Sequence, residues 1–288
     1  MVDDSAIWQD HQQRINQVLL YLQAHLDVLP TLEELATVAS YSPYHFHRLF
    51  RAITGESVSR YVRRLRLESA ANKLRFTTSD ITRIALDAGY ETSSAFNKAF
   101  KKQFGLSPTQ FRETAVANLQ QKIKQTPQVH AQLSLPTIET LAEQPVLYVR
   151  KIGSFAESST TAWQTLMEYA YGHRLMRSTT RRLGLVYDAP DLTDEDKLRY
   201  DACITFVGSP QLEGEVGLQT IVGGRYAVFL HKGSYEGFSD SYNTIYGQWF
   251  MQSNEQLREA PVFEEYLNRD PRRTKPENLR TLIYIPIL

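Results

Sequence analysis

Two similar stretches of sequence determine the fold of the first part of the chain. They are LATVASYSPYHFHRLFRAITGESVSRY (residues 35–61) and IALDAGYETSSAFNKAFKKQFGLSPTQF (residues 84–111). The first part of each stretch aligns at an offset of 49 residues and the remainder at 50, so one residue is inserted in the turn. The aligned positions include Leu35/Ile84, Ala39/Ala88, Phe46/Phe96, Phe50/Phe100 and Gly55/Gly105. Each copy predicts a short helix, a turn and a longer helix, which is a helix-turn-helix motif.

Helical signals extend on both sides of these copies. Thr31 followed by Glu34 is a capping box, Pro43 suits the first turn of a helix, and Gly55 and Gly105 suit helix ends. The periodicity of apolar residues predicts an all-α domain with helices over residues 8–26, 32–39, 43–53, 58–74, 81–88 and 92–104.

Charge is distributed unevenly, although the whole chain of 288 residues has a net charge of zero. Residues 40–112 contain 13 Lys and Arg against 5 Asp and Glu, whereas residues 126–288 contain 16 against 20. A basic helical region joined to an acidic one indicates a polyanionic partner for the first region only. The charge pattern alone is also compatible with a helical bundle whose basic faces are simply solvated.

The second helix of each motif supplies candidate DNA-binding residues. A recognition helix lies in the major groove and contacts bases with its first turns, while basic residues farther along contact phosphates. The intervening helix, about 25 Å long at 1.5 Å per residue, can hold two such helices about one DNA turn apart. The predicted DNA-binding residues are Tyr44, His47, Arg48, Arg51, Ser93, Ser94, Asn97, Lys98, Lys101 and Lys102.

Residues 10–115 resemble the DNA-binding domain of AraC/XylS-type transcription regulators. The matching strings are LEELA (32–36), SPYHFHRLF (42–50), IALDAGY (84–90) and FNKAFK (96–101), followed by Gly105, Ser107-Pro108 and Phe111-Arg112. The resemblance implies two recognition helices in successive major grooves of double-stranded DNA and regulation, as an activator, through contact with RNA polymerase.

The second half predicts strands mixed with helices. Strands are expected over residues 146–152, 202–207, 225–231 and 281–287, and helices over 162–171 and 238–252. Gly153-Ser154-Phe155 recurs as Gly233-Ser234-Tyr235, so we expect an α+β domain built from a duplicated β-α-β-β unit, with a groove at its pseudo-twofold axis. The predicted organisation is a DNA-binding domain (1–115), a linker (116–140) and an α+β domain (141–288).

Residues 140–288 resemble the GyrI-like effector-binding domain, and the order of the two domains resembles Rob-type regulators. The matching strings include PVFEEY (261–266) and YIPI (284–287). The resemblance implies an amphipathic, often cationic, small ligand held in an aromatic groove by a buried acid, which matches Glu264; the adjacent Glu265 is the alternative. The predicted ligand-binding residues are Glu264, Tyr266, Trp163, Tyr187, Tyr235, Phe238 and Tyr242.

Two other functions remain as alternatives. Some GyrI-like proteins are hydrolases, so Glu264 with Tyr266 or Tyr242 could act as an acid–base pair; a constitutive DNA-binding protein without a ligand is the other. The DNA-binding half favours sensing, and we expect no enzyme activity, catalytic residue, cofactor or metal. With a single cysteine, Cys203, no signal peptide and no long apolar run, the expected location is cytoplasmic, without a membrane partner.

Overall fold

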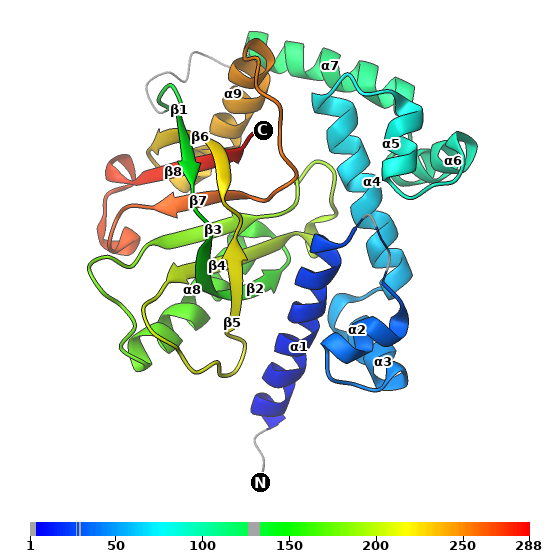
Figure 1. Ribbon diagram of the computed structural model, residues 1–288. Coiled ribbons are helices and arrows are strands. Elements are labelled where there is room, and N and C mark those ends of the chain that lie inside the picture. Colours follow the sequence, from blue (N-terminus) through cyan, green and yellow to red (C-terminus); the bar gives the residue numbers. More distant parts are fainter. Residues whose placement is uncertain (1–3, 27, 29, 126–132) are drawn as a thin grey trace. The chain divides into compact units, whose positions relative to one another are not determined.

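The computed structural model describes residues 4–26, 28, 30–125 and 133–288, which form two compact units (Figure 1). The first unit comprises the described residues up to Ala115 together with two later segments, Ala189–Lys197 and Leu212–Gly217. The second comprises Val116–Asp188, Leu198–Gln211 and Leu218–Leu288. The predicted linker (116–140) contains the end of a helix and most of a strand, and residues 126–132 lie outside the described residues. The boundaries at 115 and 140 therefore stay predictions.

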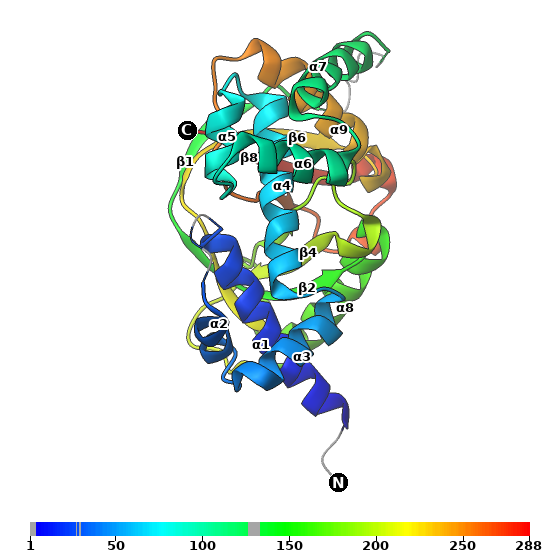
Figure 2. The same cartoon turned by 90° about the vertical axis from the view of Figure 1, so that its right-hand side faces the viewer.

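The helical unit places one helix-turn-helix motif at each end of a long central helix. The helices are α1 (Asp4–Ala24), α2 (Leu32–Val38), α3 (Pro43–Thr54), α4 (Val58–Phe76), α5 (Ile81–Asp87), α6 (Ser93–Phe104) and α7 (Pro108–Gln125). Figure 2 shows α2 and α3 at one end of α4, and α5 and α6 at the other. Every predicted helix is present, with ends that differ by a few residues.

Local capping explains where these helices begin and end. The predicted capping box before α2 is complete: the Glu34 amide donates to Thr31 Oγ1 at 3.2 Å and the Thr31 amide donates to Glu34 Oε2 at 2.7 Å. The recognition helices α3 and α6 end at Gly55 and Gly105, which have φ values of 75° and 77°. Glycine adopts this left-handed conformation without a steric penalty, so both helices stop at the same point of the repeat.

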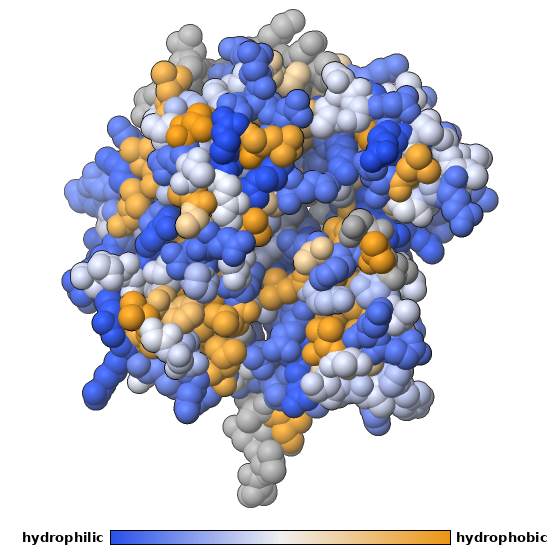
Figure 3. Space-filling model, in the orientation of Figure 1, coloured by the Kyte–Doolittle hydropathy of each residue, from blue (hydrophilic) through white to orange (hydrophobic). Residues whose placement is uncertain are grey.

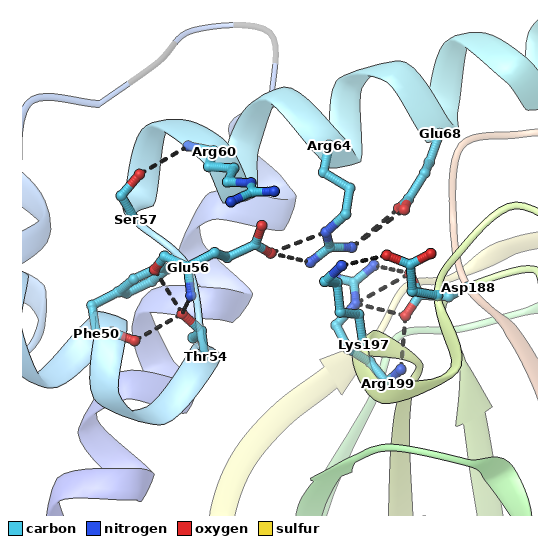
Figure 4. Close-up of polar contacts among 11 residues, drawn as sticks. Phe50, Thr54, Glu56, Ser57, Arg60, Arg64, Glu68, Asp188, Lys197 and Arg199 are labelled. Carbon is cyan, nitrogen blue, oxygen red and sulfur yellow. Dashed lines mark hydrogen bonds and ion pairs between the residues drawn. The ribbon is translucent and has the colours of Figure 1, made fainter. Parts of the chain in front are cut away.

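Each motif has its own hydrophobic core, and an ion-pair network stabilises α4 between them. Phe46 and Phe50 are fully buried in the first core, and Phe96 and Phe100 are fully buried in the second. The Arg64 guanidinium lies between two acids: Nη2 is 2.7 Å from Glu56 Oε1, and Nη1 is 3.3 Å from Glu68 Oε2 (Figure 4). Because all three side chains are buried, replacing Arg64 by a neutral residue would leave two buried carboxylates without the guanidinium that compensates them.

The second unit contains one eight-stranded sheet with helices packed against it, and the spatial order of the strands differs from their order in the sequence. Its strands are β1 (Thr137–Leu141), β2 (Gln144–Ile152), β3 (Arg182–Val186), β4 (Arg199–Thr205), β5 (Gly217–Ile221), β6 (Gly224–Lys232), β7 (Val262–Tyr266) and β8 (Arg280–Pro286). Their order in the sheet is β1-β6-β8-β7-β3-β4-β2-β5. The helices are α8 (Phe155–Gly172) and α9 (Phe238–Thr244), and α9 continues as a π-helix over Ile245–Phe250.

The sheet confirms the predicted duplication and adds a strand to each copy. β1, β2 and β3 correspond to β5, β6 and β7 at an offset of 80 residues, so each repeat is β-β-α-β-β. The first strands are exchanged: β1 pairs with β6 of the other repeat, and β5 lies beside β2. The middle of the sheet is the antiparallel pair β3–β7, where Gly184 lies directly opposite Glu264. This register places Glu264 at the pseudo-twofold axis.

Apolar side chains of the sheet and helices form the interior of this unit. Phe229, Ile283 and Ile285 pack with Ile245 of the π-helix and with Trp249. On the face drawn in Figure 3, the hydrophobic residues at the surface lie in separate groups among hydrophilic ones. Cys203 is buried in β4 and is a free thiol, so it packs there as a small apolar side chain.

Candidate functional site

The second helices of the two motifs present a polar surface. On α3, Tyr44, His47, Arg48 and Arg51 are exposed, and the Arg48 guanidinium lies 5.1 Å from the centre of the Tyr44 ring. On α6, Ser94, Asn97, Lys98, Lys101 and Lys102 are exposed, and Ser93 is half-buried. The buried phenylalanines hold the opposite side of each helix in its core, which leaves the candidate base-reading side chains facing solvent.

Glu264 is the centre of a second cluster of predicted residues. Its side chain points to the helix-covered side of the sheet and is only 3% exposed. Tyr242 Oη of α9 donates to Glu264 Oε1 at 2.8 Å, and Tyr266 Oη donates to Oε2 at 2.6 Å. Both carboxylate oxygens therefore accept a hydrogen bond from a phenol, which compensates part of the cost of burying the acid.

The hydrogen bonds continue from Tyr266 to α8. Trp163 Nε1 donates to Tyr200 Oη at 2.8 Å, and Tyr200 Oη lies 2.9 Å from Tyr266 Oη. Because the Tyr266 proton is directed at Glu264, Tyr200 is the donor to Tyr266. The result is a directed series of donors from Trp163 through two tyrosines to the carboxylate.

Gly184 makes room for this series. A Cβ at this position would lie 2.4 Å from Tyr200 Oη and 2.8 Å from Tyr266 Oη, which is too close for two nonbonded heavy atoms. Glycine opposite Glu264 thus lets both phenols reach the middle of the sheet. The sequence pattern did not identify Gly184 or Tyr200, because neither lies in a recognisable motif.

Burial dominates the electrostatics of the cluster. It raises the pKa of Glu264 to about 7, although the hydrogen bonds from Tyr266 and Tyr242 oppose the shift. Burial and the nearby Glu264 together raise the pKa of Tyr235 to about 12. The phenols therefore remain neutral donors at neutral pH, whereas Glu264 is poised to gain or lose a proton near pH 7.

Aromatic rings surround the acid. The Trp163 ring contacts the Tyr266 ring edge-on, with centroids 5.6 Å apart, and Tyr235 contacts both Tyr266 and Phe238. These contacts bring Trp163, Tyr235, Phe238, Tyr242 and Tyr266 together around Glu264.

Tyr187 and Glu265 are positioned elsewhere. Tyr187 was predicted to bind the ligand, but its hydroxyl donates to Asp201 Oδ2 at 2.7 Å in a separate cluster with Arg150. Side chains alternate between the two faces of a strand, so Tyr187, three residues after Gly184, belongs to the face opposite Glu264. Glu265 also points away and forms a two-bond ion pair with Arg181. Glu264 is therefore the inward-facing acid.

Within the described parts of the chain, no group of three or more His, Cys, Asp and Glu side chains is arranged to hold a metal ion. Among the helices that the structure describes, none combines the length and the apolar character needed to cross a membrane.

Known proteins match both units. A family model described as GyrI-like small molecule binding domain matches residues 135–288, and a helix-turn-helix domain model matches residues 35–114. The "Right origin-binding protein" of Escherichia coli strain K12 is 27% identical, over 95% of this chain and 97% of its own. The "Transcriptional regulator Rob" of Salmonella typhimurium strain LT2 is 26% identical with the same coverage.

The helical part alone has further relatives. The "Regulatory protein SoxS" of Escherichia coli strain K12 is 32% identical over 35% of this chain and 95% of its own. Of the relatives named as regulators, one matches nearly the whole chain and one matches the helical part alone, and the GyrI-like family model matches the part that contains Glu264. The chain belongs to the GyrI-like small-molecule-binding family and, with its AraC-type helix-turn-helix domain, is a DNA-binding transcription regulator with the Rob-type order of domains.

Proposed function

We propose that α3 and α6 read two boxes of an asymmetric DNA site in successive major grooves. Arg48 is suited to guanine, which it can contact through O6 and N7, and Asn97 is suited to adenine. Arg51, Lys101 and Lys102, farther along the same helices, are suited to phosphates. Duplication of the motif within one chain supports binding as a monomer, because each chain carries two reading helices.

The Glu264 cluster is the proposed site for a small amphipathic cation. The single observation that supports this is a buried carboxylate that is surrounded by aromatic rings and accepts hydrogen bonds from two hydroxyls, while no basic side chain in the described part of the chain forms an ion pair with it. A cation would supply the missing countercharge, and aromatic faces would add cation–π attraction of roughly 0.5–2 kcal/mol. Since Glu264 is buried, the ligand must displace part of the aromatic shell as it enters.

A regulatory role accounts for the two units better than catalysis does. The relatives that match nearly the whole chain include a protein named as a transcription regulator, and the first unit contains DNA-binding motifs. We propose that the chain is not an enzyme and that it activates transcription in the cytoplasm by contact with RNA polymerase. The hydrolase alternative predicts turnover of a reactive electrophile that is lost in Glu264→Gln.

Titration of the full chain with tetraphenylphosphonium tests the ligand proposal. Binding is followed by the fluorescence of Trp163 and Trp249, with Glu264→Gln as the test variant and Glu236→Gln, an exposed acid, as the matched control. We expect quenching or a spectral shift in the wild type and the control, and at least about tenfold weaker binding in Glu264→Gln, since the variant lacks the countercharge. Equal binding by all three proteins would refute the assignment, and no binding at all would favour the constitutive alternative.

A further inference from the structure

The segment that connects β3 to β4 belongs to the compact unit formed by the helices. Residues Ala189–Lys197 are grouped with the first unit, although the strands on either side belong to the second. Leu192 is 8% exposed and belongs to the core of the second helix-turn-helix motif, a cluster that also contains Leu67, Phe96 and Phe100. Ala189 packs against the same core. The second motif is therefore completed by residues from the other half of the sequence.

Charges strengthen the same contact. Both terminal nitrogens of Arg75 on α4 contact the Asp191 carboxylate, at 3.1 Å for Nη1–Oδ1 and 2.9 Å for Nη2–Oδ2. Asp194 forms an ion pair with Lys197, and its pKa is lowered chiefly by that partner and to a smaller extent by Arg64 of α4. The segment therefore combines an apolar anchor with a two-bond ion pair.

The internal repeat provides a comparison for this segment. In the corresponding connection, between β7 and β8, the offset changes from 80 to 81 residues, because β3 matches β7 at 80 whereas β4 matches β8 at 81. At the offset of 81, Pro190 and Thr193 match Pro271 and Thr274, and Leu192 corresponds to Arg273. The Arg273 side chain is 89% exposed and pairs with Asp270 within its own loop. The two connections differ at several positions, of which this is one, and of the two only the copy with leucine there belongs to a helix-turn-helix core in the described part of the chain. This difference indicates a specific role for Leu192.

The residues on either side of the segment connect it to the Glu264 cluster. Arg199 and Asp188 form a buried ion pair across it, with Nη2 2.6 Å from Oδ1 and the Arg199 amide 2.8 Å from Oδ2 (Figure 4). The next residue, Tyr200, donates to Tyr266 and so reaches Glu264. On the other side, β3 carries Gly184, directly opposite Glu264. Both strands that leave the segment therefore contribute to the ligand cluster.

We infer that the β3–β4 segment, anchored by Leu192 and Asp191, couples ligand binding at Glu264 to the second helix-turn-helix motif. Leu192 and Asp191 act as positioning residues for that motif. This inference rests on the proposed ligand site. Movement of Tyr200 or Gly184 to admit a ligand shifts the ends of the segment, and the segment transmits the shift to the core behind α6. The coupling acts on the box read by α6 more than on the box read by α3, because Leu192 belongs to the second core only.

The test measures DNA affinity of the full chain with and without saturating tetraphenylphosphonium. The wild type is compared with Leu192→Ala, with Asp191→Asn, which retains the leucine, and with Arg273→Ala as the control at the equivalent position. We expect the probe to change the dissociation constant for DNA at least about fivefold in the wild type and in the control. The change should fall below about twofold in both test variants while the probe's own affinity for DNA-free protein stays within about twofold of wild type.

Retention of the full probe effect in both test variants would overturn the coupling, as would a wild type that binds the probe with no change in DNA affinity. If the wild type does not bind the probe, the ligand proposal fails. The coupling is then tested without ligand, by the replacement Gly184→Ala. Gly184→Ala displaces Tyr200 and Tyr266 directly. In hydrogen exchange it should alter protection of α5 and α6 at least about threefold more than that of α2 and α3, and equal effects on both motifs would overturn the inference.

Discussion

The replacement Glu264→Gln should change the pH dependence of stability in a direction fixed by burial. The folded protein holds this carboxyl at a pKa of about 7, against 4.5 for an unperturbed glutamate. A raised pKa means that the folded state binds the proton more tightly than the unfolded state. The associated stability is fully present below about pH 4.5 and is lost as the pH rises through 7. Glutamine has no such proton to lose.

The magnitude follows from the shift. Each pKa unit corresponds to about 1.4 kcal/mol, so between pH 5 and pH 8 the wild type should lose about 2.5 kcal/mol relative to Glu264→Gln. The assay is urea unfolding at several pH values, monitored through Trp163 and Trp249, which both lie in the second unit. Glu236→Gln, at an exposed position, is the control. A stability difference between wild type and Glu264→Gln that stays constant from pH 5 to pH 8 would refute the role assigned to burial.

Three further substitutions probe the fold and the site. Phe100→Ala removes a fully buried ring from the second core and should lower the free energy of unfolding by about 3–5 kcal/mol in thermal melts; a loss below 1 kcal/mol would contradict that packing. Thr31→Ala removes the capping box of α2 and should cost about 1 kcal/mol in urea unfolding, with no loss counting against the cap. Gly184→Ala should weaken tetraphenylphosphonium binding at least about tenfold in calorimetry, and unchanged binding would show that Tyr200 and Tyr266 can move freely.

The helical unit could be predicted closely because its signals are local. The Thr31–Glu34 box and the glycines at 55 and 105 mark helix ends within a few residues of where they act. The repeated phenylalanines show which side of each recognition helix is buried. Because the same pattern occurs twice, each helix assigned in one copy is supported by its counterpart in the other.

The sheet was harder to predict because its pairing is nonlocal. The edge strand β1 is short and mostly exposed, so it has no apolar run to reveal it. β5 is equally short, and only its first and last residues are buried. Their exchange between repeats depends on which strand edges remain unpaired, which a single sequence does not show. Which of the two adjacent acids, Glu264 or Glu265, lies opposite Gly184 likewise depends on the register of β3 against β7.

Tyr187 illustrates the same limit for the site. Its aromatic ring suited the ligand cluster, but the two-residue period of a strand assigns it to the face of Asp201. Tyr200 lies in a strand whose residues are all buried. An alternation of polar and apolar residues therefore could not show which face of the sheet Tyr200 occupies. The role of Leu192 depends on a contact with residues more than 90 positions away, which no local pattern encodes.

Selection of bound duplexes from a random DNA pool, at fixed salt, tests most directly whether one chain reads DNA with two helices. The wild type and Arg48→Ala are selected in parallel. We predict an asymmetric site of roughly 20 base pairs with two boxes about one helical turn apart. Arg48→Ala should lose its preference in one box only. No enriched sequence, or loss of preference across both boxes in Arg48→Ala, would contradict reading by two independent helices.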